Sequence, residues 1–106
     1  MMNMGNMNKM MKQVQKLQAD MARTQEELES RTVEASAGGG AVTVVVSGKQ
    51  ELKAIAIKSE VIDPADPELL EDLIVAAVNE GLHKAQAMVA EEMAKLTGGL
   101  KLPGLF

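Results

Sequence analysis

Four cations in the first quarter of the chain have the spacing of a binding surface. They are Lys9, Lys12, Lys16 and Arg23, at successive intervals of three, four and seven residues. In a helix these intervals place side chains along one side, so the four would form a basic stripe. Such a stripe can contact the backbone phosphates of a nucleic acid without distinguishing its bases. The same pattern is typical of a solvated helix face, and the spacing leaves both interpretations open.

Positive charge is concentrated in this part of the chain. Asp20 and three glutamates within residues 26–29 offset it toward the end of the same segment, and Lys84, Lys95 and Lys101 add charge along and beyond a second predicted helix. The whole chain has a net charge of -4, so no general basic field favours a polyanion. A contact with nucleic acid would therefore depend on the local stripe.

Residues that could form a catalytic or metal centre do not converge. His83 is the only histidine and the chain has no cysteine, so neither a cysteine nor a second histidine can join it in a catalytic centre. Asp63 and Asp66 lack the ligand density of a calcium loop, and a loop with a helix cap explains them better. The glycines at 38–40 lack the Lys-Ser/Thr of a phosphate-binding loop, which favours a hairpin turn. We expect no enzyme activity, no metal and no cofactor.

Composition also limits the compartment and the type of ligand. The absence of cysteine excludes disulfides and favours a reducing cytosol. No apolar run approaches the roughly 18 residues of a membrane span, and the N-terminus lacks the features of a signal peptide. Phe106 is the only aromatic residue, which argues against single-strand binding by base stacking. We expect a cytoplasmic protein without a membrane partner.

The first predicted element is a helix over about residues 6–30. Its apolar residues follow a heptad pattern: Met7, Met10, Val14, Leu17, Met21 and Leu28. This is the period of helices that pack side by side, and the seam is too long for a small sheet to cover. Part of it should therefore pack on another helix. The methionines at the start of the chain could form an adaptable binding surface or simply a frayed helix start.

The middle of the chain changes to a strand pattern. We predict strands at about residues 31–36, 41–47 and 51–58, joined by short turns as an antiparallel meander. Alternation along the strands places apolar residues on both faces of the sheet. The helices can cover one face, so we expect a second copy of the chain to cover the other. The expected dimer interface comprises Val44, Val45, Val46, Ile55 and Ile57.

The last predicted element is a helix over about residues 67–96. Asp66 is a suitable N-cap, Pro67 suits the first helical position, and Gly98 and Gly99 end the helix. The chain is therefore expected to form a single α+β domain over residues 1–106. Flexible tails are expected at about 1–6 and 98–106.

Four stretches of the sequence resemble one known family. They are GNMNKMMKQVQKLQ at 5–18, GAVTVVVSGKQEL at 40–52, LLEDLIVAAVNE at 69–80 and MAKLTGGL at 93–100, the last followed by LPG at 102–104. In this order they are similar to the YbaB/EbfC family of bacterial nucleoid-associated proteins. The resemblance extends over nearly the whole chain.

The resemblance implies both a fold and a function. The fold would be a long helix, a three-stranded antiparallel sheet and a second long helix (α-β-β-β-α), in a homodimer whose helical arms project like tweezers. The function would be binding of double-stranded DNA in the nucleoid, to organise it or to regulate gene expression. The matching basic positions are Lys9, Lys12 and Lys16, with Arg23, Lys84 and Lys95 as further candidates.

A second interpretation uses different parts of the chain. The methionine-rich start and the apolar segment 100–106 could bind a protein, such as a recombination or replication factor. The chain would then be a non-catalytic scaffold.

Overall fold

The computed structural model describes residues 4–98. Its elements are α1 (Met4–Ser30), β1 (Thr32–Ala37), β2 (Val42–Ser47), β3 (Leu52–Ile57), the short 3-10 helix η1 (Ser59–Val61) and α2 (Pro67–Gly98). The predicted α-β-β-β-α order is therefore confirmed. Residues 4–6 and Gly98, which were expected in the tails, belong to α1 and α2. The other tail residues, 1–3 and 99–106, lie outside the described residues.

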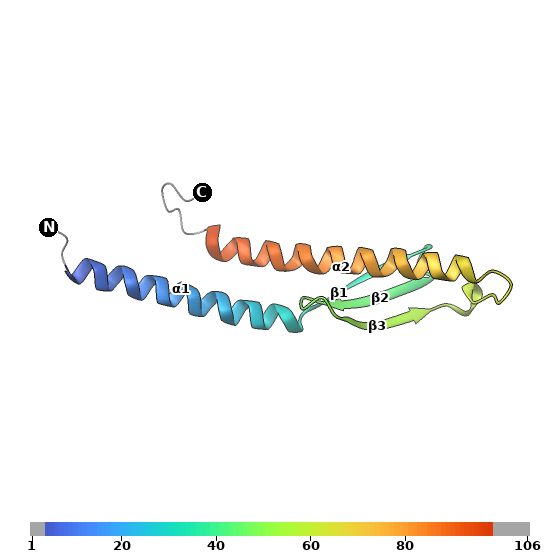
Figure 1. Cartoon of the computed structure of the whole chain (residues 1–106), viewed down its shortest axis with the longest axis horizontal. Coiled ribbons are helices and arrows are strands. Elements are labelled where there is room, and N and C mark those ends of the chain that lie inside the picture. Colours follow the sequence, from blue (N-terminus) through green and yellow to red (C-terminus); the bar gives the residue numbers. More distant parts are fainter. Residues whose placement is uncertain (1–3, 99–106) are drawn as a thin grey trace.

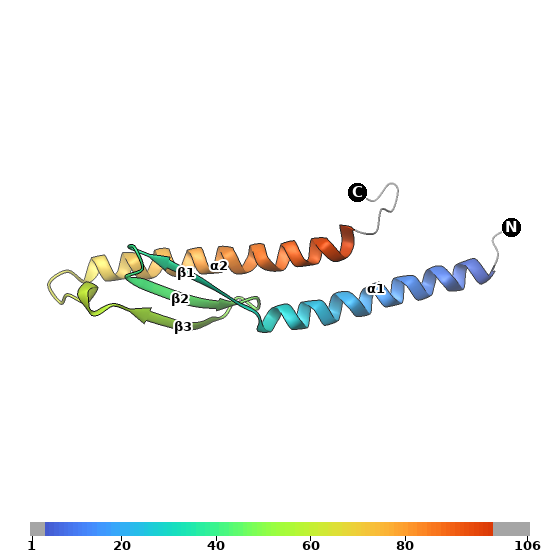
Figure 2. The ribbon, with the colours of Figure 1, turned by 180° about the vertical axis from the view of Figure 1, so that it is seen from behind.

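The molecule is elongated. Its principal extents are 78 × 24 × 16 Å and its radius of gyration is 21.2 Å, whereas a compact chain of this length would have a radius of gyration of about 13 Å. Figures 1 and 2 show the reason: α1 leaves one end of the sheet and projects away from it. The C-terminal half of α2 runs beside the inner half of α1, and the outer half of α1 extends beyond the end of α2.

The sheet has the strand order β1-β2-β3, with both neighbouring pairs antiparallel. A bulge between Val45 and Val46 changes the register, so that Val45 faces Ala54 but Val46 faces Leu52. In a regular strand the side chains alternate between the two faces, which would put Leu52 on the same face as Ala54. The bulge adds one residue to β3, so Leu52 lies on the other face, opposite Val46. The sequence pattern does not reveal this bulge.

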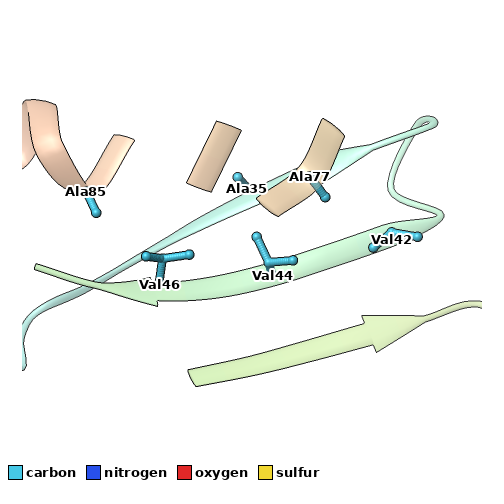
Figure 3. Packing of buried hydrophobic residues seen from close by; sticks show 6 residues of the cluster. All are labelled: Ala35, Val42, Val44, Val46, Ala77 and Ala85. Atoms are coloured by element: carbon cyan, nitrogen blue, oxygen red, sulfur yellow. The ribbon is translucent and has the colours of Figure 1, made fainter. Parts of the chain in front are cut away.

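The core lies between the sheet and α2. Val42, Val44 and Val46 are fully buried on β2, and Ala77 and Ala85 are fully buried on α2. Figure 3 shows the valine side chains of β2 directed toward the helix above them. Gly81 completes the small-residue face of α2, because a Cβ there would lie 2.7 Å from Cγ2 of Val46. Small residues four apart thus let the helix axis approach β2 closely.

The helix does not cover the whole sheet. It contacts β1 and β2 extensively, whereas β3 is exposed along most of its length. Leu52 and Ile55 on β3 are 46% and 42% exposed. The face away from α2 carries mainly small or polar residues, among them Ser36, Ala54 and Ala56. The large uncovered apolar side chains therefore lie along the β3 edge rather than across the far face.

The glycine turn and the cap of α2 are both as the sequence predicted. The glycines at 38–40 have φ values of 65°, 67° and 92°, a region that glycine enters without a steric penalty, and they link β1 to β2. Asp66 caps α2, because its Oδ1 accepts a hydrogen bond from the amide of Leu69 at 3.4 Å.

The packing at Gly81 predicts the effect of adding one methyl group. Gly81→Ala should lower the free energy of unfolding by about 1 kcal/mol, since overpacking against two β2 valines exceeds the gain in helix propensity. Urea denaturation at matched protein concentration would measure it. Gly5→Ala, at the exposed start of α1, is the matched control and should not destabilise. Equal stability of Gly81→Ala and the parent chain would contradict the close-approach argument.

Candidate nucleic-acid interface

Three cations of the basic stripe stand on the projecting half of α1. Lys9, Lys12 and Lys16 are all exposed, and none of them forms an ion pair with another residue in the range 4–98. No aspartate or glutamate precedes Asp20 in the sequence. The outer half of α1, which we call the arm, therefore carries three positive charges that no acidic residue of the same half offsets.

The orientation of these lysines follows from the apolar seam of the same helix. Leu28 is 2% exposed at the inner end of α1, where the seam faces the rest of the chain. Met10 and Val14 continue that seam outward and are 60% and 54% exposed. With 3.6 residues per turn, Lys9 and Lys16 fall on roughly the opposite side of the helix. The stripe thus faces away from α2 and into solvent.

Arg23 continues the basic stripe but has an acidic neighbour. Its Nη2 donates a 2.8 Å hydrogen bond to Oδ1 of Asp20, and its side chain is 67% exposed. An exposed pair of this kind contributes little to stability, so the guanidinium remains available to an external anion. Its charge is nevertheless partly offset, unlike that of Lys16 and the lysines before it.

The two α2 candidates lie on another helix and already have partners. Lys84 donates from Nζ to the backbone oxygen of Glu34 on β1 at 3.1 Å. Lys95 Nζ lies 3.1 Å from Oε1 of Glu92, and Arg31 Nη1 lies 3.7 Å from the same oxygen. The hydrogen bond from Lys95, its charge and the charge of Arg31 lower the pKa of Glu92. The α1 cations therefore share one side of one helix, whereas Lys84 and Lys95 lie on α2 with partners of their own.

The pair between Arg31 and Glu92 was not visible in the sequence pattern. It joins the start of the sheet to the C-terminal half of α2 where the arm begins. The amide of Gly48 also donates to the backbone oxygen of Arg31 at 2.9 Å. These contacts link residues 17 and 61 positions apart, and no local spacing indicates them. They help set the position from which α1 projects.

Side chains considered for other chemistry have structural explanations. His83 is exposed on α2. Asp63 forms a turn, its Oδ1 accepting a 2.9 Å hydrogen bond from the amide of Ala65. Within the described chain, no three His, Asp or Glu side chains are grouped to hold a metal ion. None of the helices in the same range is long and apolar enough to cross a membrane.

The expected dimer residues divide into two groups. Val44 and Val46 are fully buried beneath α2, which removes them from any surface that a partner could contact. Val45 and Ile57 are half-buried, and Ile55 is 42% exposed. The accessible part of the expected interface is therefore narrower than the sequence suggested.

Comparison with known proteins identifies relatives along the chain. The model of the YbaB/EbfC DNA-binding family matches residues 4–100. A nucleoid-associated protein of Desulforamulus reducens is 66% identical over 102 residues, covering 96% of this chain and 97% of the relative. A nucleoid-associated protein of Pelotomaculum thermopropionicum is 64% identical over 102 residues, with the same coverage of both chains.

A solved structure shares the architecture. An uncharacterized protein from Helicobacter pylori superposes with a TM-score of 0.59 at 21% identity, over 84% of this chain and 98% of that one. At this identity the likeness supports the fold alone. The family model and the relatives above carry the assignment, and this chain belongs to the YbaB/EbfC DNA-binding family.

Proposed function

We propose that the chain acts as a homodimer that binds double-stranded DNA in the cytoplasmic nucleoid, mainly through backbone phosphates, and so organises the nucleoid or regulates gene expression. The observation that carries the proposal is the uncompensated positive charge of Lys9, Lys12 and Lys16 on a projecting helix. Membership of a DNA-binding family and the names of the relatives support the choice of ligand.

The chemistry of the arm favours phosphates over bases. Lysine is a flexible point charge without the planar donor fork that reads guanine edges. The rise from Lys9 to Lys16 is about 10 Å along the helix axis, which spans several phosphates of a duplex. Binding of this kind depends on charge rather than on sequence. We therefore propose weak sequence preference and strong salt dependence.

The acidic remainder of the chain restricts where DNA can approach. All 15 acidic residues follow position 19, so the sheet, α2 and the inner half of α1 carry the negative charge. A polyanion would be repelled there and attracted to the outer half of α1. The net charge of -4 is thus compatible with a local DNA contact.

The β3 edge is the surface that a second protomer would cover. An edge strand presents unpaired backbone groups, and here it also presents Leu52 and Ile55 beside the area that α2 covers. Pairing there would bury these side chains and leave both α1 arms projecting. Within the proposed interface, Ile55 is the best exposed of the expected residues. Ile57 lies two residues further along the same strand, and Val45 lies on the other face of the sheet, opposite Ala54.

A second candidate is a protein-binding scaffold without catalytic activity, for a recombination or replication factor. It is favoured by the exposed apolar residues of α1, of which Met10 and Met11 are 60% and 57% exposed. Capture of the same proteins before and after nuclease treatment would favour it over DNA binding. Loss of all captured proteins on nuclease treatment would favour DNA.

Charge reversal on the arm provides the test of DNA binding. The variant Lys9→Glu, Lys12→Glu, Lys16→Glu should bind a random duplex far more weakly at low salt. Any residual binding should show a log–log salt slope shallower by about 1 for each phosphate that the variant no longer neutralises. An electrophoretic shift assay across salt concentrations measures both quantities.

A matched triple variant separates position from net charge. Lys49, Lys53 and Lys58 lie at or beside β3 and are exposed, so reversing all three gives the same change in net charge away from the arm. Because β3 is the edge proposed to pair, light scattering first checks that this variant keeps the mass of the parent protein. This control should bind much more tightly than the arm variant. Equally weak binding by both variants would contradict the assigned site, and a parent protein that does not bind DNA at low salt would contradict the function.

The dimer is tested at the β3 edge. Ile55→Glu should convert a particle of twice the 11.3 kDa chain mass into one of single mass, because pairing would bury an unpartnered carboxylate. Light scattering after size exclusion gives the mass, and circular dichroism checks folding. Ile62→Glu, an exposed isoleucine beyond the sheet, should remain dimeric. A folded Ile55→Glu variant of double mass would show that the interface lies elsewhere.

A further inference from the structure

The outer half of α1 carries an apolar surface that no described element covers. A shallow groove of about 390 Å³ is lined by Met7, Met10, Met11, Val14 and Gln15. The first four of these side chains are between 46% and 60% exposed. Met7, Met10 and Val14 continue the seam by which the inner half of α1 packs on the rest of the chain, and Met11 lies beside them. We call this surface the methionine groove.

The C-terminal end of α2 lies close to one end of the methionine groove. The two helices run antiparallel, and Gly48 lies against both Leu28 of α1 and Val89 of α2. Counting from this level at about 1.5 Å per residue along each helix, Gly98 falls roughly level with Asp20. From there the groove occupies about the next 10–20 Å along α1. It therefore begins close to where α2 ends.

The residues after Gly98 have the length and composition to cover the groove. Eight residues, 99–106, can span at most about 26 Å. They include four large apolar side chains, namely Leu100, Leu102, Leu105 and Phe106. Pro103 cannot continue a helix, and an extended chain would cover distance along α1 faster than a helix does. The segment thus reaches the full length of the groove.

We propose that residues 100–106 bind in the methionine groove of their own chain. Leucine and phenylalanine side chains would cover the thioethers, and contact between sulfur and an aromatic ring adds to apolar burial. A second α1 helix is the other conceivable occupant. The two are separated below by whether the cross-link forms within one chain or between two chains.

This contact would stabilise the arm itself. About 16 residues of α1 extend beyond α2, and a helix of this length without tertiary contacts is marginal in water. Covering the groove leaves the lysines on the opposite side of the helix free. The contact does not require that the arm bind DNA, so its test needs no DNA. Where the proposed function also holds, the contact keeps the three lysines in one row.

The unusual composition of the chain permits a direct measurement. Phe106 is the only Phe, Tyr or Trp of the chain, and the one other aromatic ring, the His83 imidazole, lies on α2. A ring-current shift that Phe106→Leu removes therefore comes from Phe106. In the full chain labelled at methionine methyls, Met7, Met10 or Met11 should show upfield shifts that disappear in Phe106→Leu. Met88, on α2, should not change. Absence of any Phe106-dependent shift in these three signals would overturn the proposal.

A cross-link determines whether the contact lies within one chain. Because the chain has no cysteine, Met10→Cys with Leu105→Cys should form a disulfide within a single chain when oxidised with copper phenanthroline. The monomer band of a non-reducing denaturing gel should then contain few thiols that a maleimide can alkylate, and reduction should restore them. Lys12→Cys with Leu105→Cys places the thiol on the other side of α1 and should form far less. Equal yields in both pairs, or a product only at double mass, would overturn docking within the chain.

Discussion

The close approach of α2 to β2 is the constraint on which the rest of the molecule depends. Gly81 lies between two alanines at four-residue intervals, and all three face fully buried valines. A side chain larger than glycine at position 81 would meet Val44 and Val46 within 3 Å. Packing of this density tolerates few alternative placements of a helix. It fixes α2 over β1 and β2, and hence determines what remains uncovered.

Two consequences follow from that placement. The first is that β3 keeps an exposed apolar edge, with Ile55 opposite the buried Val44 but outside the cover of α2. The second is that α2, at 32 residues, is much longer than the strands it covers and continues past the sheet. The part of α2 beyond the sheet packs against the inner half of α1. One helix thus creates both the proposed dimer surface and the base of the arm.

Sequence reasoning recovered the elements because their signals are local. Heptad spacing, β-branched runs, the Asp66 cap and the glycine turn each depend on residues close together in the chain, and each corresponds to an observed element. The bulge after Val45 escaped detection because the mismatch arises between two strands. The cover of Val44 and Val46 is hidden from the sequence for a related reason: alternation identifies the face on which they lie but not that α2 covers it.

At the candidate site, too, the sequence predicted what depends on neighbouring residues and missed contacts between residues far apart in the chain. The spacing of Lys9, Lys12 and Lys16 placed them on one side of a helix, and the structure agrees. Spacing could not show that Lys84 and Lys95 already have partners, since Lys84 binds a backbone oxygen 50 residues away. Nor could it show where α2 ends relative to α1, which decides how much of the arm is free.

The two halves of α1 suit different partners because the seam and the charge change along the same helix. The inner half has its seam against the chain and carries the acidic residues, so it suits contact with protein rather than with a polyanion. The outer half has neither α2 nor acidic residues beside it. Because the seam must face inward at Leu28, helical periodicity directs Lys9 and Lys16 outward along the whole arm. The orientation of the proposed DNA-binding surface is therefore set at the opposite end of the helix, by packing against the core.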